Sequence, residues 1–268
     1  MMPEDGACFR DLLHKSIPVD IDQAALLFSG DTDSLTILWT LLDLGIQVTC
    51  YTFRLERVFS TDSKVAQKVT AHWGIPSIHV IAPYQEPEIL AQDVRQVIHI
   101  IGSHRKTHVE VMWGYWYLLA QVEQEIVFSG LQADTLYGSS RNMAIRYSKD
   151  PKAFIEARRK LIANPDQEGY QQAQKLASYF GKDLHTPYTN QGIREFMLGY
   201  SWAELNRPKQ KMPAVWGFIP EFRNLPVYRR NDNMQCDSGI REYMARMLDS
   251  SVNINHKRHV QELYKEMI

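Results

Sequence analysis

Residues 26–34, which read Leu-Leu-Phe-Ser-Gly-Asp-Thr-Asp-Ser, constrain the fold more than any other stretch of this chain. The apolar run at 24–28 is typical of a buried strand, and large aliphatic residues recur at helical spacing from 35 to 44. Residues 29–34 should therefore connect the carboxyl end of a strand to the amino end of a helix. Free backbone N–H groups and the helix dipole favour an anion at such a junction. We expect a phosphate there.

The side chains of this loop suit a nucleotide phosphate. Ser29 and Ser34 offer hydroxyl donors, Gly30 permits close approach of the backbone, and Asp33 can hold Mg²⁺. The Gly-Lys-Ser/Thr ending of a Walker A loop is absent. Ordinary capping of a helix N-terminus is the structural alternative. The candidate nucleotide-binding residues of the loop are Ser29, Gly30, Asp31, Thr32, Asp33 and Ser34.

Composition, charge and cysteine spacing favour a globular protein and give no support to several other classes. The chain has 268 residues, with 44% hydrophobic and 23% charged residues, as in a globular protein with a substantial core. A formal net charge of -1 does not indicate nucleic acid as a partner. Cys8, Cys50 and Cys236 are far apart, so we expect neither a disulfide framework nor a zinc site. No apolar run suits a bilayer or secretion, and we expect a cytoplasmic protein.

Strand and helix patterns alternate through the first half of the chain. Strands are expected at 46–53, 75–81 and 126–128, a helix at 34–44 ending at Gly45, and helical sequence at 88–123 with breaks near Gly102 and Gly114. This alternation predicts an α/β fold with a doubly wound, mainly parallel sheet. Residues 1–150 should form the ATP-binding core and 151–268 a helical part that completes the substrate site. Phe53, at the end of a strand, joins the candidate nucleotide contacts.

A second Ser-Gly loop follows the strand at 126–128. Ser129 and Gly130 come directly after it, and Asp134 lies four residues beyond Gly130. In a parallel sheet both loops belong to the carboxyl edge, so Asp33 and Asp134 are expected to share one Mg²⁺ with phosphate oxygens. The pair of loops therefore predicts an ATP and Mg²⁺ site more strongly than either loop alone.

The first loop resembles the Ser-Gly-Gly-x-Asp-Ser pyrophosphate loop of the ATP pyrophosphatase superfamily, whose fold is of the adenine nucleotide alpha hydrolase type. Asp31 stands in place of the second glycine. Together with the second loop, the chain resembles the synthetase domain of asparagine synthetase and β-lactam synthetase. There the second loop reads Ser-Gly-Glu-Gly-x-Asp-Glu, which matches Ser129, Gly130 and Asp134 but not Leu131 or Thr135. The loss of the glutamate at Leu131 puts amide formation from ammonia in doubt and leaves adenylation intact.

The resemblance also implies a lysine that contacts the phosphates beyond the helix expected at 191–199. Lys211 and Lys209 are the candidates, and the apolar turn that follows favours Lys211. Positive charge is chemically required, because attack on the α phosphate develops negative charge on the leaving pyrophosphate. The structural alternative is that both lysines lie on the surface. Weaker candidates for substrate contacts are Arg141, Arg146, Gln235, Asp237 and Arg241, and Ser238-Gly239 is either a third anion site or a helix cap.

The resemblance implies an AMP-forming ligase. A carboxylate or similar oxygen would be adenylated with release of pyrophosphate, and ammonia or an amine would then displace AMP. No glutaminase domain is expected ahead of the first strand, so a separate amidotransferase subunit is one possible nitrogen source. Two alternatives stay open: a related enzyme that modifies a nucleobase in tRNA or DNA, and a catalytically degenerate subunit that binds nucleotide without turnover. The sequence does not predict the oligomeric state.

Overall fold

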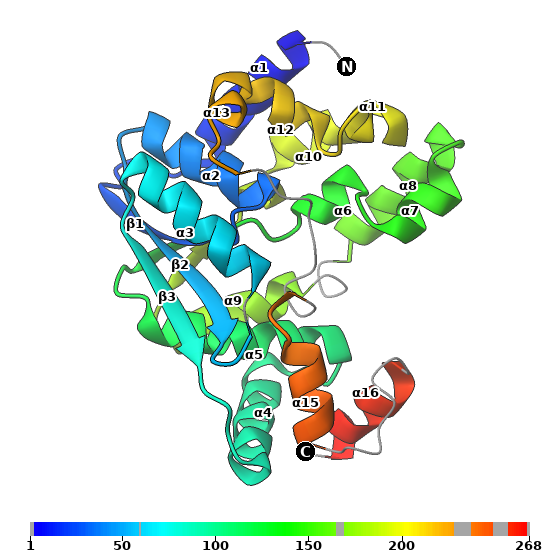
Figure 1. The fold of residues 1–268 in the computed structure, drawn as a ribbon. Coiled ribbons are helices and arrows are strands. Elements are labelled where there is room, and N and C mark those ends of the chain that lie inside the picture. The colour runs from blue at the N-terminus through cyan, green and yellow to red at the C-terminus, as the bar shows by residue number, and fades with distance from the viewer. Residues whose placement is uncertain (1–2, 59, 165–168, 228–236, 249–256, 267–268) are drawn as a thin grey trace.

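In a computed structural model, which describes residues 3–58, 60–164, 169–227, 237–248 and 257–266, a five-stranded sheet runs through the centre of the protein (Figure 1). The strand order is β3-β2-β1-β4-β5, and every pairing is parallel. The strands are β1 (Gln23–Leu27), β2 (Gln47–Leu55), β3 (Ser77–Ala82), β4 (Ile126–Ser129) and β5 (Asp183–His185). The order changes direction between β1 and β4, as expected of a doubly wound α/β sheet.

Helices cover both faces of the sheet because the buried strand residues alternate between two cores. Ala25 and Leu27 belong to one core, whereas Leu26 and Phe28 belong to the other. The first core is closed by α4 (Pro87–Ile101), α5 (Lys106–Gln121), α9 (Tyr170–Tyr179), α15 (Ile240–Leu248) and α16 (Lys257–Glu266). The second contains residues of α1 (Pro3–Ser16), α2 (Thr32–Asp43), α3 (Thr61–Trp73), α6 (Ala133–Tyr137), α8 (Pro151–Ile162), α10 (Gln191–Leu198), α11 (Trp202–Asn206) and α12 (Met212–Gly217).

The predicted elements are present, with differences at particular residues. The helix after the first loop begins at Thr32 rather than at 34, because the Asp31 side chain caps it. Gly102 ends α4 in the left-handed conformation, whereas Gly114 lies inside α5 and does not break it. The break expected near Gly114 was wrong, because this glycine is buried within the helix and packing stabilises the turn around it.

The second half of the chain joins the first half in two places. β5 pairs with β4 beyond the proposed boundary at residue 150, and sequence analysis did not predict it. α15 returns to α4 and α5 through Tyr243 and its neighbours, on the face opposite α2 (Figure 1). The two remaining helices named here are α7 (Arg141–Tyr147) and α13 (Ile219–Arg223). Among the described helices, none combines the length and apolar character needed to cross a membrane.

Candidate functional site

The two Ser-Gly loops lie side by side where the strand order reverses. Leu27 at the end of β1 is in register with Ser129 at the end of β4. A Cβ atom on Gly130 would lie 3.1 Å from the Cβ atom of Asp33, which is closer than side chains normally approach. Glycine at this position therefore allows the second loop to contact the first. The predicted meeting of the loops at the carboxyl edge of the sheet is confirmed.

The first loop is held by hydrogen bonds among its own residues. Asp31 Oδ1 accepts hydrogen bonds from the backbone N–H of Ser34 and from Ser34 Oγ, both at 2.9 Å. The Gly30 N–H donates to Ser34 Oγ at 3.1 Å, and the Asp31 N–H donates to Ser29 Oγ at 3.3 Å. A carboxylate of the chain thus already accepts from the helix N-terminus, where we expected a phosphate.

Gly30 is required for packing. Its φ angle is +76°, and an added Cβ would lie 2.7 Å from Val65 Cγ1 of α3. The glycine therefore lets the loop press against α3. Of the candidate nucleotide contacts, Gly30 and Thr32 lie beside the cavity described below and not in its lining, whereas the others line it.

Lys211 connects the two loops from a third segment of the chain. Its side chain is buried, and its ammonium group forms ion pairs with Asp33 Oδ2 and with Asp134 Oδ1, the latter at 3.0 Å. Asp33 is also buried, whereas 52% of the Asp134 side chain is exposed. Lys211 has a φ angle of +62°, a strained conformation for a residue with a side chain. Lys209, the other candidate, is exposed on the surface.

The carboxylates control the charge of Lys211. Burial opposes the charged form, but Asp33, Asp134 and Asp31 outweigh that effect and place the pKa of Lys211 above its ordinary value. For Asp33, burial raises the pKa well above its usual range, although Lys211 acts to lower it. Lys211 is therefore a permanent positive charge at neutral pH, and the negative charge of Asp33 depends on that lysine.

The donor atoms suit a metal ion that takes most of its ligands from substrate and water. Asp33 Oδ1 is buried and has no hydrogen-bond partner among the described residues, so one carboxylate oxygen is available. Asp33 and Asp134 converge on one point, since both contact the same ammonium group. No cluster of three or more metal-binding side chains occurs in the described ranges. Mg²⁺ accepts such a site when phosphate oxygens and waters complete its coordination.

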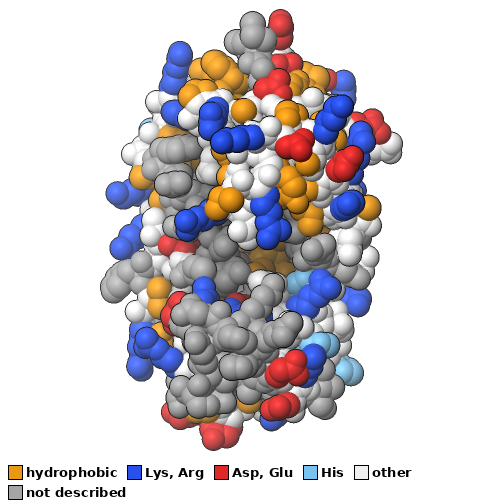
Figure 2. Space-filling view, turned by 90° about the vertical axis from the view of Figure 1, so that its right-hand side faces the viewer, with side chains coloured by type: hydrophobic (Ala, Val, Ile, Leu, Met, Phe, Trp, Pro, Cys, Tyr) orange, Lys and Arg blue, Asp and Glu red, His pale blue; other side chains and the backbone are white. Residues whose placement is uncertain are grey.

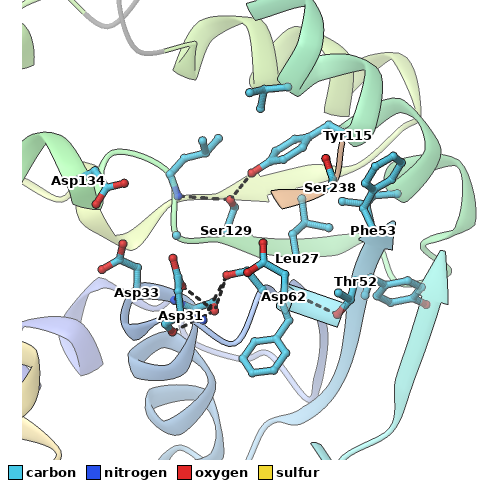
Figure 3. Close-up of a pocket in the computed structure, with 18 of the residues that line it drawn as sticks. Leu27, Asp31, Asp33, Thr52, Phe53, Asp62, Tyr115, Ser129, Asp134 and Ser238 are labelled. Atoms are coloured by element: carbon cyan, nitrogen blue, oxygen red, sulfur yellow. Dashed lines mark hydrogen bonds between the residues drawn. The ribbon is translucent and has the colours of Figure 1, made fainter. Parts of the chain in front are cut away.

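A cavity of about 250 Å³ opens beside the loops (Figure 3). Its two ends differ in character. Asp31, Asp33 and Asp134 lie at one end, and Leu27 and Phe53 lie at the other. Figure 2 shows hydrophobic side chains at the bottom of a depression at mid-height, with basic and acidic side chains interspersed around it. The cavity thus combines a polar end with an apolar end, an arrangement common in small-molecule sites.

Several residues that line the cavity were not predicted as nucleotide contacts, among them Tyr115, Gln132 and Ser238. Tyr115 of α5 hydrogen-bonds Ser129 Oγ at 3.0 Å, and burial raises the pKa of its phenol to about 12. Gln132 has a φ angle of +73° and a buried Nε2 atom with no hydrogen-bond partner among the described residues. Ser238 reaches the cavity from the C-terminal part of the chain. Gln132 carried a detectable signal, because it stands where the resembled loop has glycine.

Other candidate contacts have different roles or positions. Arg141 and Arg146 are exposed on α7 and do not line the cavity. The Asp237 carboxylate caps α3, where it accepts hydrogen bonds from Ser60 Oγ and from the Asp62 N–H. Asp237, a candidate substrate contact, therefore has a structural role at the start of α3. Gln235 and Cys236 lie outside the described residues.

Comparisons with other proteins give no independent assignment, because neither a protein-family model nor a curated protein matches the chain.

Proposed function

We propose that the protein binds ATP with Mg²⁺ and transfers AMP to an oxygen of a second substrate. The observation that carries this proposal is the convergence of Asp33, Asp134 and Lys211 where the two Ser-Gly loops meet. Three segments far apart in sequence place one cation and two carboxylates at the carboxyl edge of a parallel sheet, where such folds bind ligands. The likeness of both loops to the asparagine synthetase pattern further supports an AMP-forming ligase.

In this proposal the phosphates occupy the polar end of the cavity. Ser29, Ser34, Ser129 and the backbone of Gly130 line the cavity and would orient the phosphates in exchange for their present hydrogen bonds, and Asp33 and Asp134 would hold the metal ion. When bound, Mg²⁺ would neutralise part of the phosphate charge. Lys211 would exchange part of its contact with the carboxylates for contact with phosphate oxygens. Its charge then opposes the negative charge that develops on the leaving group.

The reaction has two steps. A carboxylate oxygen of the second substrate forms a bond to the α phosphorus, the bond from that phosphorus to the bridging oxygen breaks, and pyrophosphate leaves. The amine nitrogen then attacks the acyl carbon, AMP leaves, and the nitrogen loses a proton. Ammonia, an amine or the product of a separate amidotransferase subunit would supply the nitrogen. Leu131, which lines the cavity, offers no group to accept that proton.

A second candidate function is nucleotide binding without turnover. Asp31 supports it, because its carboxylate occupies N–H donors at the helix start that a phosphate would otherwise use. Leu131 supports it as well, because the resembled loop has glutamate there. Both candidates place the protein in the cytoplasm, where ATP is available.

One experiment separates these functions. Purified protein is supplied with Mg²⁺, ATP labelled at the α phosphate, and a panel of amino acids, amines and nucleosides, and the products are resolved. The AMP-forming ligase predicts equal amounts of pyrophosphate and AMP. Release of ADP and phosphate would refute the mechanism. Tight binding of ATP without any product would favour the non-catalytic function.

Asp31 should weaken nucleotide binding through its charge. Asparagine caps a helix as well as aspartate does, so Asp31→Asn should change the free energy of unfolding by less than about 0.5 kcal/mol. Loss of the negative charge should tighten binding of Mg-ATP about 3- to 10-fold, as measured by calorimetry. Asp31→Ala removes the cap and should cost about 1 kcal/mol of stability. Weaker binding by Asp31→Asn would instead assign Asp31 to the metal site.

A further inference from the structure

The apolar end of the cavity contains one hydroxyl group supplied by the C-terminal part of the chain. Figure 3 places Ser238 near Tyr115 and Phe53, away from Asp33 and Asp134. We propose that Ser238 Oγ hydrogen-bonds the purine ring of the bound nucleotide and contributes to base recognition. This inference rests on the proposed nucleotide site.

The hydroxyl of Ser238 is buried and lacks a hydrogen-bond partner in the part of the chain that the structure describes. Only 2% of the residue is exposed, and Oγ makes no hydrogen bond to any described residue. The serines of the two loops already have hydrogen-bond partners: Ser29 bonds Ser34, and Ser129 bonds Tyr115. A buried hydroxyl without a partner costs free energy, and native proteins contain few of them. A ligand in the cavity would supply the missing hydrogen bond.

Hydrogen bonds and close packing of neighbouring residues fix the position of Ser238. The preceding residue, Asp237, accepts hydrogen bonds from Ser60 Oγ at 2.7 Å and from the Asp62 N–H at 2.9 Å. The following residue, Gly239, has a φ angle of +77°, and an added Cβ would lie 2.9 Å from Val58 Cγ2. Further along α15, the Tyr243 hydroxyl accepts a hydrogen bond from the Gln85 N–H at 2.8 Å. Ser238 is therefore held by neighbours on both sides, as a ligand-contacting residue requires.

The chemistry of this end suits a purine. Leu27, Phe53 and Leu118 offer apolar surface to a planar ring. The ring nitrogens of adenine accept hydrogen bonds and its exocyclic amine donates them, and a serine hydroxyl satisfies either kind of group. The phosphates would occupy the opposite end, because Asp33 and Asp134 line it and Lys211 pairs with both carboxylates. A base at the apolar end and phosphates at the polar end are consistent with one bound nucleotide.

The test compares two ligands that share phosphates but differ in the base. Binding of Mg-ATP and of Mg-tripolyphosphate is measured by calorimetry for the wild type, Ser238→Ala and the control Ser77→Ala, an exposed serine on β3. We expect Ser238→Ala to weaken Mg-ATP binding about 5- to 10-fold and to change tripolyphosphate binding less than about 2-fold. Ser77→Ala should leave both affinities unchanged.

The outcomes separate this inference from the function on which it rests. Equal weakening of both ligands by Ser238→Ala would overturn it, because the residue would then act only on the shape of the site. Unchanged Mg-ATP binding would also overturn it and would leave the nucleotide site intact. Failure of the wild-type protein to bind either ligand would refute the proposed function itself. Circular dichroism and thermal unfolding of Ser238→Ala confirm that the variant is folded.

Discussion

Replacing Lys211 with methionine is expected to lower the free energy of unfolding by about 3–5 kcal/mol and to reduce pyrophosphate release by at least about 100-fold. Methionine keeps the length of the side chain but removes the charge. Asp33 then loses its cation. Because only 5% of its side chain is exposed, water cannot replace that cation. Asp134 should contribute little to this loss, because 52% of its side chain is exposed.

A double variant measures how much of the stability loss comes from the unpaired charge of Asp33. Lys211→Met combined with Asp33→Asn replaces the buried ion pair with two neutral side chains of similar size. Stability in denaturant titration should recover by at least about half of the loss, since no unpaired charge remains. Pyrophosphate release should stay absent. Recovery of activity together with stability would show that Lys211 has only a structural role. Lys209→Met is the matched control for loss of a nearby lysine charge.

Changing either carboxylate to its amide should make nucleotide binding insensitive to Mg²⁺. For Asp33→Asn and Asp134→Asn we expect Mg-ATP affinity to fall by at least about 10-fold, since even residues that merely support a metal ligand contribute 10- to 100-fold. Without Mg²⁺, in excess chelator, ATP should bind these variants at least as well as the wild type, because a negative charge beside the phosphates has been removed.

Asp134→Asn is the cleaner of the two metal-site variants. Asp134 is half-exposed, and Ser139 Oγ donates a hydrogen bond to it at 2.5 Å, which the asparagine oxygen can also accept. Its thermal unfolding should therefore match the wild type, whereas Asp33→Asn disturbs a buried pair. Equal Mg²⁺ dependence of binding in Asp134→Asn and wild type would refute the assignment of this carboxylate to the metal.

Local patterns were sufficient to predict the architecture and the meeting of the loops. The strand at 24–28 and the loop after it could be recognised because burial, small residues and a helix start follow one another along the chain. β5 could not, because three residues are too few to show a periodicity and its pairing partner, β4, lies far away in sequence.

Residue-level roles depended on contacts between distant segments. Lys209 and Lys211 have the same side chain, and only the fold shows that Lys211 is buried between two carboxylates. Asp31 was recognised as unusual, but its bonds to Ser34 depend on the local backbone geometry. Ser238 had only an ambiguous sequence signal, because a serine before a glycine at a helix start is equally typical of an anion site and of a helix cap.

The two hydrogen bonds that Asp237 accepts at the start of α3 join an early helix to a late part of the chain. The five strands, both loops and Lys211 lie within residues 23–211, whereas Ser60 Oγ and the Asp62 N–H find their acceptor only at residue 237. In a ribosome-bound chain from which residues 237 and 238 have not yet emerged, both loops are present but Ser238 does not yet line the apolar end of the cavity. If the protein binds ATP as proposed, binding should therefore begin late in biosynthesis, after Lys211 has left the ribosome.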